Sequence, residues 1–159
     1  MVDIKNKIIL DVTCGNRSIW FQKKYPRALY LDIRKEKLFF DGARKCFIEP
    51  DIIADFRELP FKDNTFKLVV FDPPHLDNLG ENAILAKKYG RLLPGWEDDI
   101  TQGINECIRV LKPDGILIFK WSESRIKIGR ILKLIKYKPL FGHNTGSNSQ
   151  TIWLTFIKD

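Results

Sequence analysis

In the stretch Lys67-Leu68-Val69-Val70-Phe71-Asp72-Pro73-Pro74-His75, a short apolar run ends in an acid and two prolines. A continuous apolar run of this length is typical of a strand buried on both faces, as in a parallel sheet. The prolines lack backbone N–H groups and fix their own φ angles, and Pro73 restrains Asp72 before it. We therefore expect a rigid cluster of carbonyl acceptors beside a carboxylate, at the sheet edge where α/β proteins bind ligands. Such a cluster is suited to holding an amino group by its hydrogens.

Apolar strands and helical patterns alternate along the rest of the chain. The sequence predicts seven strands, over residues 7–12, 28–32, 51–55, 67–72, 116–121, 137–141 and 150–157. It predicts helices near 18–24, 35–40, 96–111 and 124–135, and a long loop over 75–94 with one helical turn near 81–87. This alternation favours an α/β fold, a mostly parallel sheet with helices on both faces. Because no helix separates the last two strands, that pair should be antiparallel.

The composition is that of one soluble domain with a basic surface. The 159 residues are 44% hydrophobic and carry a net charge of +7, which is compatible with a polyanionic partner. No apolar run reaches the length of a membrane span and the N-terminus lacks the apolar core of a signal peptide, so we expect no membrane association. Three widely spaced cysteines and two histidines favour a reducing cytoplasm, without a disulfide framework or a metal site.

Four acids stand at the ends of predicted strands: Asp11, Asp32, Asp55 and Asp72. Because the carboxyl ends of parallel strands meet at one edge of a sheet, the four acids should lie together. Gly15, in the turn after Asp11, lets a ligand approach the backbone closely. Asp32 can accept hydrogen bonds from both hydroxyls of a ribose, and Asp55 from the exocyclic amine of an adenine. The turn carries neither phosphate-binding glycine pattern, so a dinucleotide held by its pyrophosphate is not expected.

Together these segments resemble the cofactor motifs of class I S-adenosylmethionine-dependent methyltransferases, over nearly the whole chain. Residues 9–15 resemble the first motif, 31–32 the ribose-binding acid, 54–61 the adenine-binding segment and 109–115 the turn before the fifth strand. The resemblance implies a Rossmann-like fold in a single methyltransferase domain over 1–159, without a separate target-recognition domain. It implies S-adenosyl-L-methionine as cofactor and S-adenosyl-L-homocysteine as product. The implied cofactor-binding residues are Asp11, Thr13, Cys14, Gly15, Asp32, Ile33, Asp55, Phe56 and Asp72.

The segment Asp72-Pro73-Pro74-His75 is similar to the Asp/Asn-Pro-Pro-aromatic motif of amino-methyltransferases. These enzymes act on adenine N6, cytosine N4 or a glutamine side-chain amide. In that family Asp72 and the Pro73 carbonyl would hold the target amine, and the fourth residue would stack on the target base. His75 stands here in place of the usual Tyr, Phe or Trp. The resemblance thus implies Asp72, Pro73, Pro74 and His75 as catalytic positions that act chiefly through positioning and desolvation.

The long loop after this motif carries basic and aromatic residues that suit an anionic acceptor. Cations there can contact phosphates, and interleaved aromatic rings can stack on bases. The loop between the last two strands should also lie on the substrate edge of the sheet. The candidate substrate-binding residues are Lys87, Lys88, Tyr89, Arg91, Trp96, Trp121 and His143.

The leading hypothesis is a methyltransferase that acts on an exocyclic amine of a nucleic acid base, with adenine N6 in DNA or RNA as the first candidate. One alternative is methylation of a protein side-chain amide or of a small-molecule amine. A second is a non-catalytic, cofactor-binding subunit of a complex, which the intact Asp72-Pro73-Pro74 disfavours. Without a target-recognition domain, the chain would use its own loop, act on RNA or single strands, or take specificity from a partner protein or a homodimer.

Overall fold

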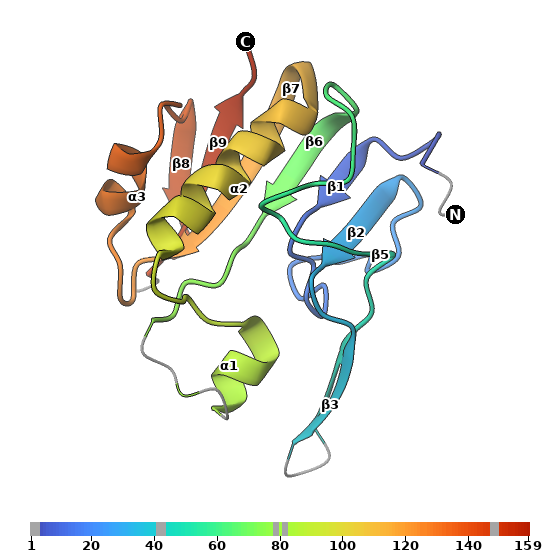
Figure 1. The fold of residues 1–159 in the computed structure, drawn as a ribbon, viewed down its shortest axis with the longest axis vertical. Coiled ribbons are helices and arrows are strands. Elements are labelled where there is room, and N and C mark those ends of the chain that lie inside the picture. Colours follow the sequence, from blue (N-terminus) through green and yellow to red (C-terminus); the bar gives the residue numbers. More distant parts are fainter. Residues whose placement is uncertain (1–3, 41–43, 78–79, 81–82, 147–149) are drawn as a thin grey trace.

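The computed structural model describes residues 4–40, 44–77, 80, 83–146 and 150–159, and its centre is a seven-stranded sheet (Figure 1). The sheet consists of β1 (Ile9–Asp11), β2 (Ala28–Asp32), β5 (Ile52–Ile53), β6 (Phe66–Phe71), β7 (Leu111–Ser122), β8 (Phe141–Asn144) and β9 (Thr151–Ile157). The strands lie in the order β5-β2-β1-β6-β7-β9-β8, and the pairs from β5 to β7 are parallel. β9 runs antiparallel to both of its neighbours. The predicted Rossmann-like sheet, mostly parallel with an antiparallel last strand, is confirmed.

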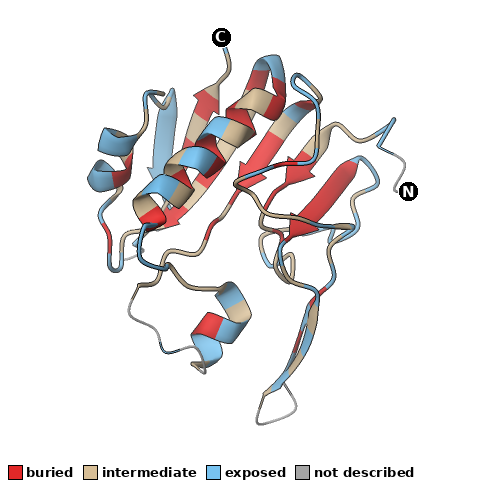
Figure 2. Cartoon of the chain, viewed as in Figure 1, coloured by how far each residue is buried: buried red, intermediate tan, exposed pale blue. Residues whose placement is uncertain are grey.

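The central strands are buried because their sequences are apolar on the face that packs in the core. β2 is buried at every position, and Figure 2 shows that burial is concentrated in these strands. Along β7, Leu117, Phe119 and Trp121 are fully buried and alternate with partly exposed residues. This period of two places one face of β7 in the core and leaves the other face more open.

Two helices cover one face of the sheet. α2 (Trp96–Val110) lies along β6 and β7, and α3 (Ile128–Leu134) packs beside it (Figure 1). Ile100, Ile104 and Cys107 of α2 are fully buried, at the helical spacing that the sequence predicts. Both helices contribute to one core with β1, β2, β6, β7 and β9. No helix in the described part of the chain is both long and apolar enough to cross a bilayer.

A loop, rather than a helix, covers the other face near β1 and β2. There Cys14, Ala28 and Tyr30 form a small cluster against Trp20 and Tyr25 of the loop that joins the two strands. Within the described residues, the helices that contact the sheet core therefore lie on one face, whereas the sequence predicts them on both.

The predicted helix at 18–24 is wrong, because these residues form turns and bends. Side-chain contacts hold this loop instead. The Arg17 guanidinium donates hydrogen bonds to the carbonyls of Lys23 at 2.8 Å and Glu49 at 2.7 Å. Two turns of helix are marginal on their own, so contacts of this kind decide the conformation.

The predicted helix at 35–40 is also wrong, because this segment is a strand. β3 (Glu36–Phe40) and β4 (Arg44–Ile48) form an antiparallel two-stranded sheet. Exposed and half-buried residues alternate along β3, and Cys46 and Ile48 of β4 are buried. The segment therefore has the period of two that marks a strand.

Other predicted elements exist with different bounds. The helical turn near 81–87 is α1 (Ile84–Tyr89), and residues 81–82 lie outside the described residues. The helix predicted over 124–135 is the shorter α3. The strand predicted over 137–141 begins only at Phe141, as β8.

Candidate functional site

A cavity of about 590 Å³ lies at the carboxyl ends of β1, β2 and β6. Its walls come from the turn after β1, the segments that follow β2, β5 and β6, the end of α1, and β7. This volume is in the range of small-molecule and cofactor sites. The predicted site residues that line the cavity are Thr13, Cys14, Gly15, Asp32, Ile33, Asp55, Phe56, Asp72, Pro73, Pro74, His75, Lys88, Tyr89 and Arg91.

Asp32 joins the end of β2 to the turn after β1. Its Oδ2 accepts a hydrogen bond from the Gly15 N–H at 2.9 Å. Its Oδ1 accepts from the Arg34 N–H at 3.0 Å and from Arg34 Nε at 3.2 Å. Gly15 has a φ of +48°, a left-handed conformation that favours glycine. A carboxylate has about four acceptor positions, so Asp32 keeps one for a hydroxyl of a ligand.

Asp11 lies outside the cavity lining, although it is a predicted cofactor residue. Its carboxylate is buried and accepts hydrogen bonds from Trp20 Nε1 at 2.7 Å and from the Thr13 N–H at 3.3 Å. Burial raises the pKa of Asp11 to about 7, while the hydrogen bonds from Trp20 and Thr13 act in the opposite direction. In this structure Asp11 holds the turn after β1 in place.

Asp55 lines the cavity together with a cation that sequence reasoning missed. Arg57 Nη2 donates to Asp55 Oδ2 at 2.5 Å, and Arg57 Nη1 donates to Asp99 Oδ1 at 2.9 Å. The hydrogen bonds from Arg57 lower the pKa of Asp55 below its ordinary value. Beside this ionised pair, the Phe56 ring packs on the ring of Phe71, with ring centroids 5.1 Å apart, and supplies an apolar wall of the cavity. Arg57 lies within residues 54–61, which resemble the adenine-binding segment of the methyltransferases. Its position close to Asp55 in that segment is the signal that could have identified it.

Asp72 is positioned by contacts from the turn after β1 and from β7. Its backbone N–H donates to Thr13 Oγ1 at 2.9 Å, which ties the end of β6 to the turn after β1. Lys120 Nζ of β7 donates to Asp72 Oδ2 at 2.6 Å, and the two side chains are 21% and 19% exposed, respectively. Burial raises the pKa of Asp72, and the Lys120 ammonium acts in the opposite direction. Sequence reasoning missed Lys120, although it is the one charged residue of the predicted strand 116–121.

His75 lines the cavity and packs edge-on against Trp121, with ring centroids 6.3 Å apart. Burial lowers the pKa of His75, while Asp72 acts in the opposite direction. The neutral imidazole is therefore favoured at neutral pH, and a neutral ring can stack on a base. The end of α1 lies close to the motif, because a Cβ atom on Gly90 would be 2.9 Å from Pro74 Cγ.

Four predicted substrate-binding residues do not line the cavity: Lys87, Trp96, Trp121 and His143. Trp121 is fully buried and donates from Nε1 to the Ile126 carbonyl at 2.8 Å. Trp96 belongs to the same core. His143 lies on β8, where it pairs with a residue of β9.

No protein-family model matches the sequence, and no curated protein sequence is significantly similar to it. Solved structures share the fold over nearly the whole chain. A protein from Pyrococcus horikoshii is 18% identical with a TM-score of 0.61, covering 95% of this chain and 81% of that one. A SAM-dependent methyltransferase from Methanosarcina mazei is 15% identical with a TM-score of 0.58, covering 94% and 91%. An rRNA methylase from Streptococcus thermophilus is 10% identical with a TM-score of 0.56, covering 96% and 88%. The chain therefore has the Rossmann-like fold of these methyltransferases.

Proposed function

We propose that the protein is an S-adenosylmethionine-dependent methyltransferase that acts on an exocyclic amine of a nucleic acid base, with adenine N6 as the first candidate. The main support for this proposal is that the residues expected to bind the cofactor and those expected to bind the acceptor line the same cavity. Asp32 and Asp55 line it together with the rigid segment Asp72-Pro73-Pro74-His75. The methyltransferase and the rRNA methylase of the same fold support the reaction class.

The residues of the cavity fit the cofactor. Asp32 offers an acceptor for a ribose hydroxyl, and Ile33 and Phe56 offer apolar contacts for an adenine ring. Asp32 and Asp72 would supply negative charge that favours a cationic sulfonium in the cavity. Gly15 carries no side chain between the backbone and the ligand. The cofactor, when bound, supplies an activated methyl group.

The chain's own residues then need to orient the acceptor. The Asp72 carboxylate and the Pro73 carbonyl accept hydrogen bonds from the two hydrogens of the target amine. Asp72 also stabilises the positive charge that grows on the nitrogen. Lys120 contacts Asp72 Oδ2, so within the described residues Oδ1 stays available as an acceptor. The neutral His75 ring supplies a stacking surface for the base that carries the amine.

The test is methyl transfer from a labelled donor to duplex DNA, single-stranded DNA, RNA and protein extract. We expect label in nucleic acid, and we expect Asp72→Ala to lower turnover at least about a hundredfold, because an interaction with the developing charge is lost. Titration calorimetry should give cofactor affinity within a few fold of the wild type. Asp98→Ala is the matched control, since Asp98 is an exposed acid of α2 outside the cavity. Full activity of Asp72→Ala would refute the catalytic assignment, and label only in protein would favour the amide alternative.

A further inference from the structure

The hairpin formed by β3 and β4 is the feature that the proposed catalytic site leaves unused. It projects from the carboxyl edge of the sheet, and α1 projects beside it (Figure 1). The Arg34 guanidinium, just before β3, donates to the Lys87 carbonyl of α1 at 2.9 Å. The hairpin is thus anchored next to the proposed site.

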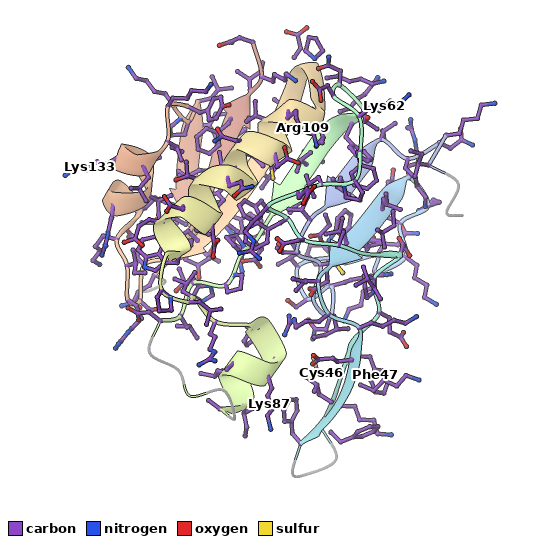
Figure 3. All side chains as sticks on the ribbon, viewed as in Figure 1. Cys46, Phe47, Lys62, Lys87, Arg109 and Lys133 are labelled. Carbon is purple, nitrogen blue, oxygen red and sulfur yellow. The ribbon has the colours of Figure 1, made fainter. Side chains whose placement is uncertain are left out.

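The two faces of the hairpin differ in chemistry. Lys37 pairs with Phe47 and Phe39 pairs with Lys45, and paired residues point to the same face of a sheet. All four are exposed, Phe39 by 68% and Phe47 by 42%. Their neighbour Cys46 is buried, and Figure 3 shows Cys46 and Phe47 on opposite sides of the hairpin. We call Lys37, Phe39, Lys45 and Phe47 the hairpin outer face.

The hairpin outer face combines exposed aromatic rings with free cations. The rings of Phe39 and Phe47 meet edge to face, with centroids 6.1 Å apart. Within the described residues, neither Lys37 nor Lys45 makes an ion pair, and the paired positions of this face in β3 and β4 carry no acid. Protein interfaces are depleted of lysine at their centres, whereas single-stranded nucleic acid binds to aromatic rings flanked by cations.

Two residues of the hairpin outer face, together with Cys46 between them, also line a second cavity of about 640 Å³. Lys45 and Phe47 form part of its wall, and Lys23 and Lys24 of the loop after β1 form another part. Its five cationic residues exceed its two acids, and one of those acids, Asp51, is paired with Arg17 at 3.6 Å. Gly15 and Asn16 line this basic cavity and the proposed cofactor cavity alike. A cationic path therefore runs from the hairpin to the turn that borders the proposed cofactor site.

We propose that the hairpin outer face and the adjoining basic cavity bind a single-stranded segment of the nucleic acid substrate, next to the target base. This inference rests on the proposed function, whose substrate class it refines. Bases stack on Phe39 and Phe47, while phosphates contact Lys37, Lys45 and the lysines of the basic cavity. The hairpin then serves as a substrate-binding arm within a single domain.

The experiment is fluorescence anisotropy without cofactor, using labelled single-stranded RNA and DNA of about 12 nucleotides and a duplex, over a series of salt concentrations. We expect single strands to bind more tightly than the duplex. Phe39→Ala/Phe47→Ala should weaken binding at least about tenfold, because two stacking surfaces are lost. Lys37→Gln/Lys45→Gln should reduce the slope of log K against log salt by about 1.4, the value for two lost phosphate contacts on a single strand.

The matched control is Lys62→Gln/Lys133→Gln, which removes the same charge from exposed positions far from the hairpin (Figure 3). This control should change affinity by less than about threefold. If the hairpin variants bind like the wild type while the wild type binds and methylates nucleic acid, the inference is wrong and the proposed function stands. If the hairpin variants weaken binding but no nucleic acid is methylated, the hairpin surface stands and the proposed function is wrong. Hairpin substitutions that turn a dimer into a monomer in light scattering would instead make this face an interface between copies, and would overturn the inference.

Discussion

At the scale of single residues, the pair between Asp72 and Lys120 sets the chemistry of the proposed active site. The carboxylate and the ammonium are 2.6 Å apart, and both side chains are mostly buried. A buried carboxylate without a partner tends to take up a proton. The cation of β7 therefore opposes protonation of Asp72, which the proposed mechanism uses as an acceptor for the amine.

Replacing Lys120 should change the pH dependence of methyl transfer. Burial already raises the pKa of Asp72, and Lys120→Met removes the cation that opposes this effect. In the proposed mechanism the ionised Asp72 carboxylate accepts the amine hydrogen and stabilises the positive charge on nitrogen, so activity should fall as the pH falls through its pKa. The acid limb of the kcat/KM profile should therefore move to higher pH in Lys120→Met. Lys120→Arg keeps a cation and serves as the control, and an unchanged acid limb in the Met variant would contradict the assignment.

A second residue-scale prediction concerns Asp11, whose pKa burial raises from 3.8 to about 7. Between these values the folded protein holds a proton that the unfolded chain has released. The contribution of Asp11 to the free energy of unfolding therefore falls as the pH rises, by at most about 1.4 kcal/mol per pH unit. Asp11→Asn removes this titration, so from about pH 4 to about pH 7 the variant should gain stability relative to the wild type. Urea unfolding of both proteins at several pH values measures the difference in their unfolding free energies. A difference that does not change with pH would contradict the prediction.

At the scale of elements, α2 shapes the proposed cofactor cavity through a close approach at Gly103. A Cβ atom there would lie 2.6 Å from Phe56 Cδ2 and 2.9 Å from Phe71 Cζ. The helix backbone thus packs directly on the ring that lines the proposed cofactor site. Only a residue without a side chain allows this approach.

Gly103→Ala should therefore destabilise the fold and disturb the proposed cofactor site together. Overpacking of this kind costs about 1–3 kcal/mol of unfolding free energy, and displacement of Phe56 should weaken cofactor binding. Gly129→Ala in α3 is the matched control, since no atom lies within 4 Å of its added Cβ. Its stability should rise by about 0.5–1 kcal/mol. Urea unfolding and calorimetric titration check both variants, and a Gly103→Ala variant as stable as the wild type would disprove the close approach.

At the scale of the whole molecule, the cavity brings together segments that are distant in the chain. The turn after β1, the ends of β2 and β6, and the end of α1 all contribute walls. A ligand that contacts these segments together binds the folded chain and not the unfolded one. Its binding energy is therefore added to the stability of the fold.

S-adenosyl-L-homocysteine should accordingly raise the Tm. At a concentration of about 100 times its Kd, the gain is about 2.7 kcal/mol, or roughly 5–10 °C for a domain of this size. Asp32→Ala should reduce this shift, because Asp32 contacts Gly15 and lines the cavity. Asp98→Ala should leave the shift unchanged. A scan without any shift in the wild-type protein would count against the cofactor assignment.

The elements that the sequence predicts correctly are those whose conformation follows from residues within the segment itself. The apolar runs of β2 and β6 and the helical spacing of α2 are complete within each segment. The segments 18–24 and 35–40 are not the helices that the sequence predicts, because contacts with residues outside each segment determine their conformation. The conformation of the first depends on Arg17 reaching the Glu49 carbonyl, 32 residues away, and that of the second depends on pairing with β4.

The sequence by itself determined the class of fold and the edge of the sheet at which the strand-end acids lie. The apolar runs, the order of strands and helices along the chain and the segment Asp72-Pro73-Pro74 can all be read from the sequence directly. Tertiary structure decided which of these groups line a common cavity. It placed Asp11 outside the cavity lining and set Lys120, 48 residues away in the chain, against Asp72. It also turned a predicted helix into the hairpin that bears the exposed face of lysine and phenylalanine. Contacts of this kind depend on packing between distant segments, and no local pattern encodes them.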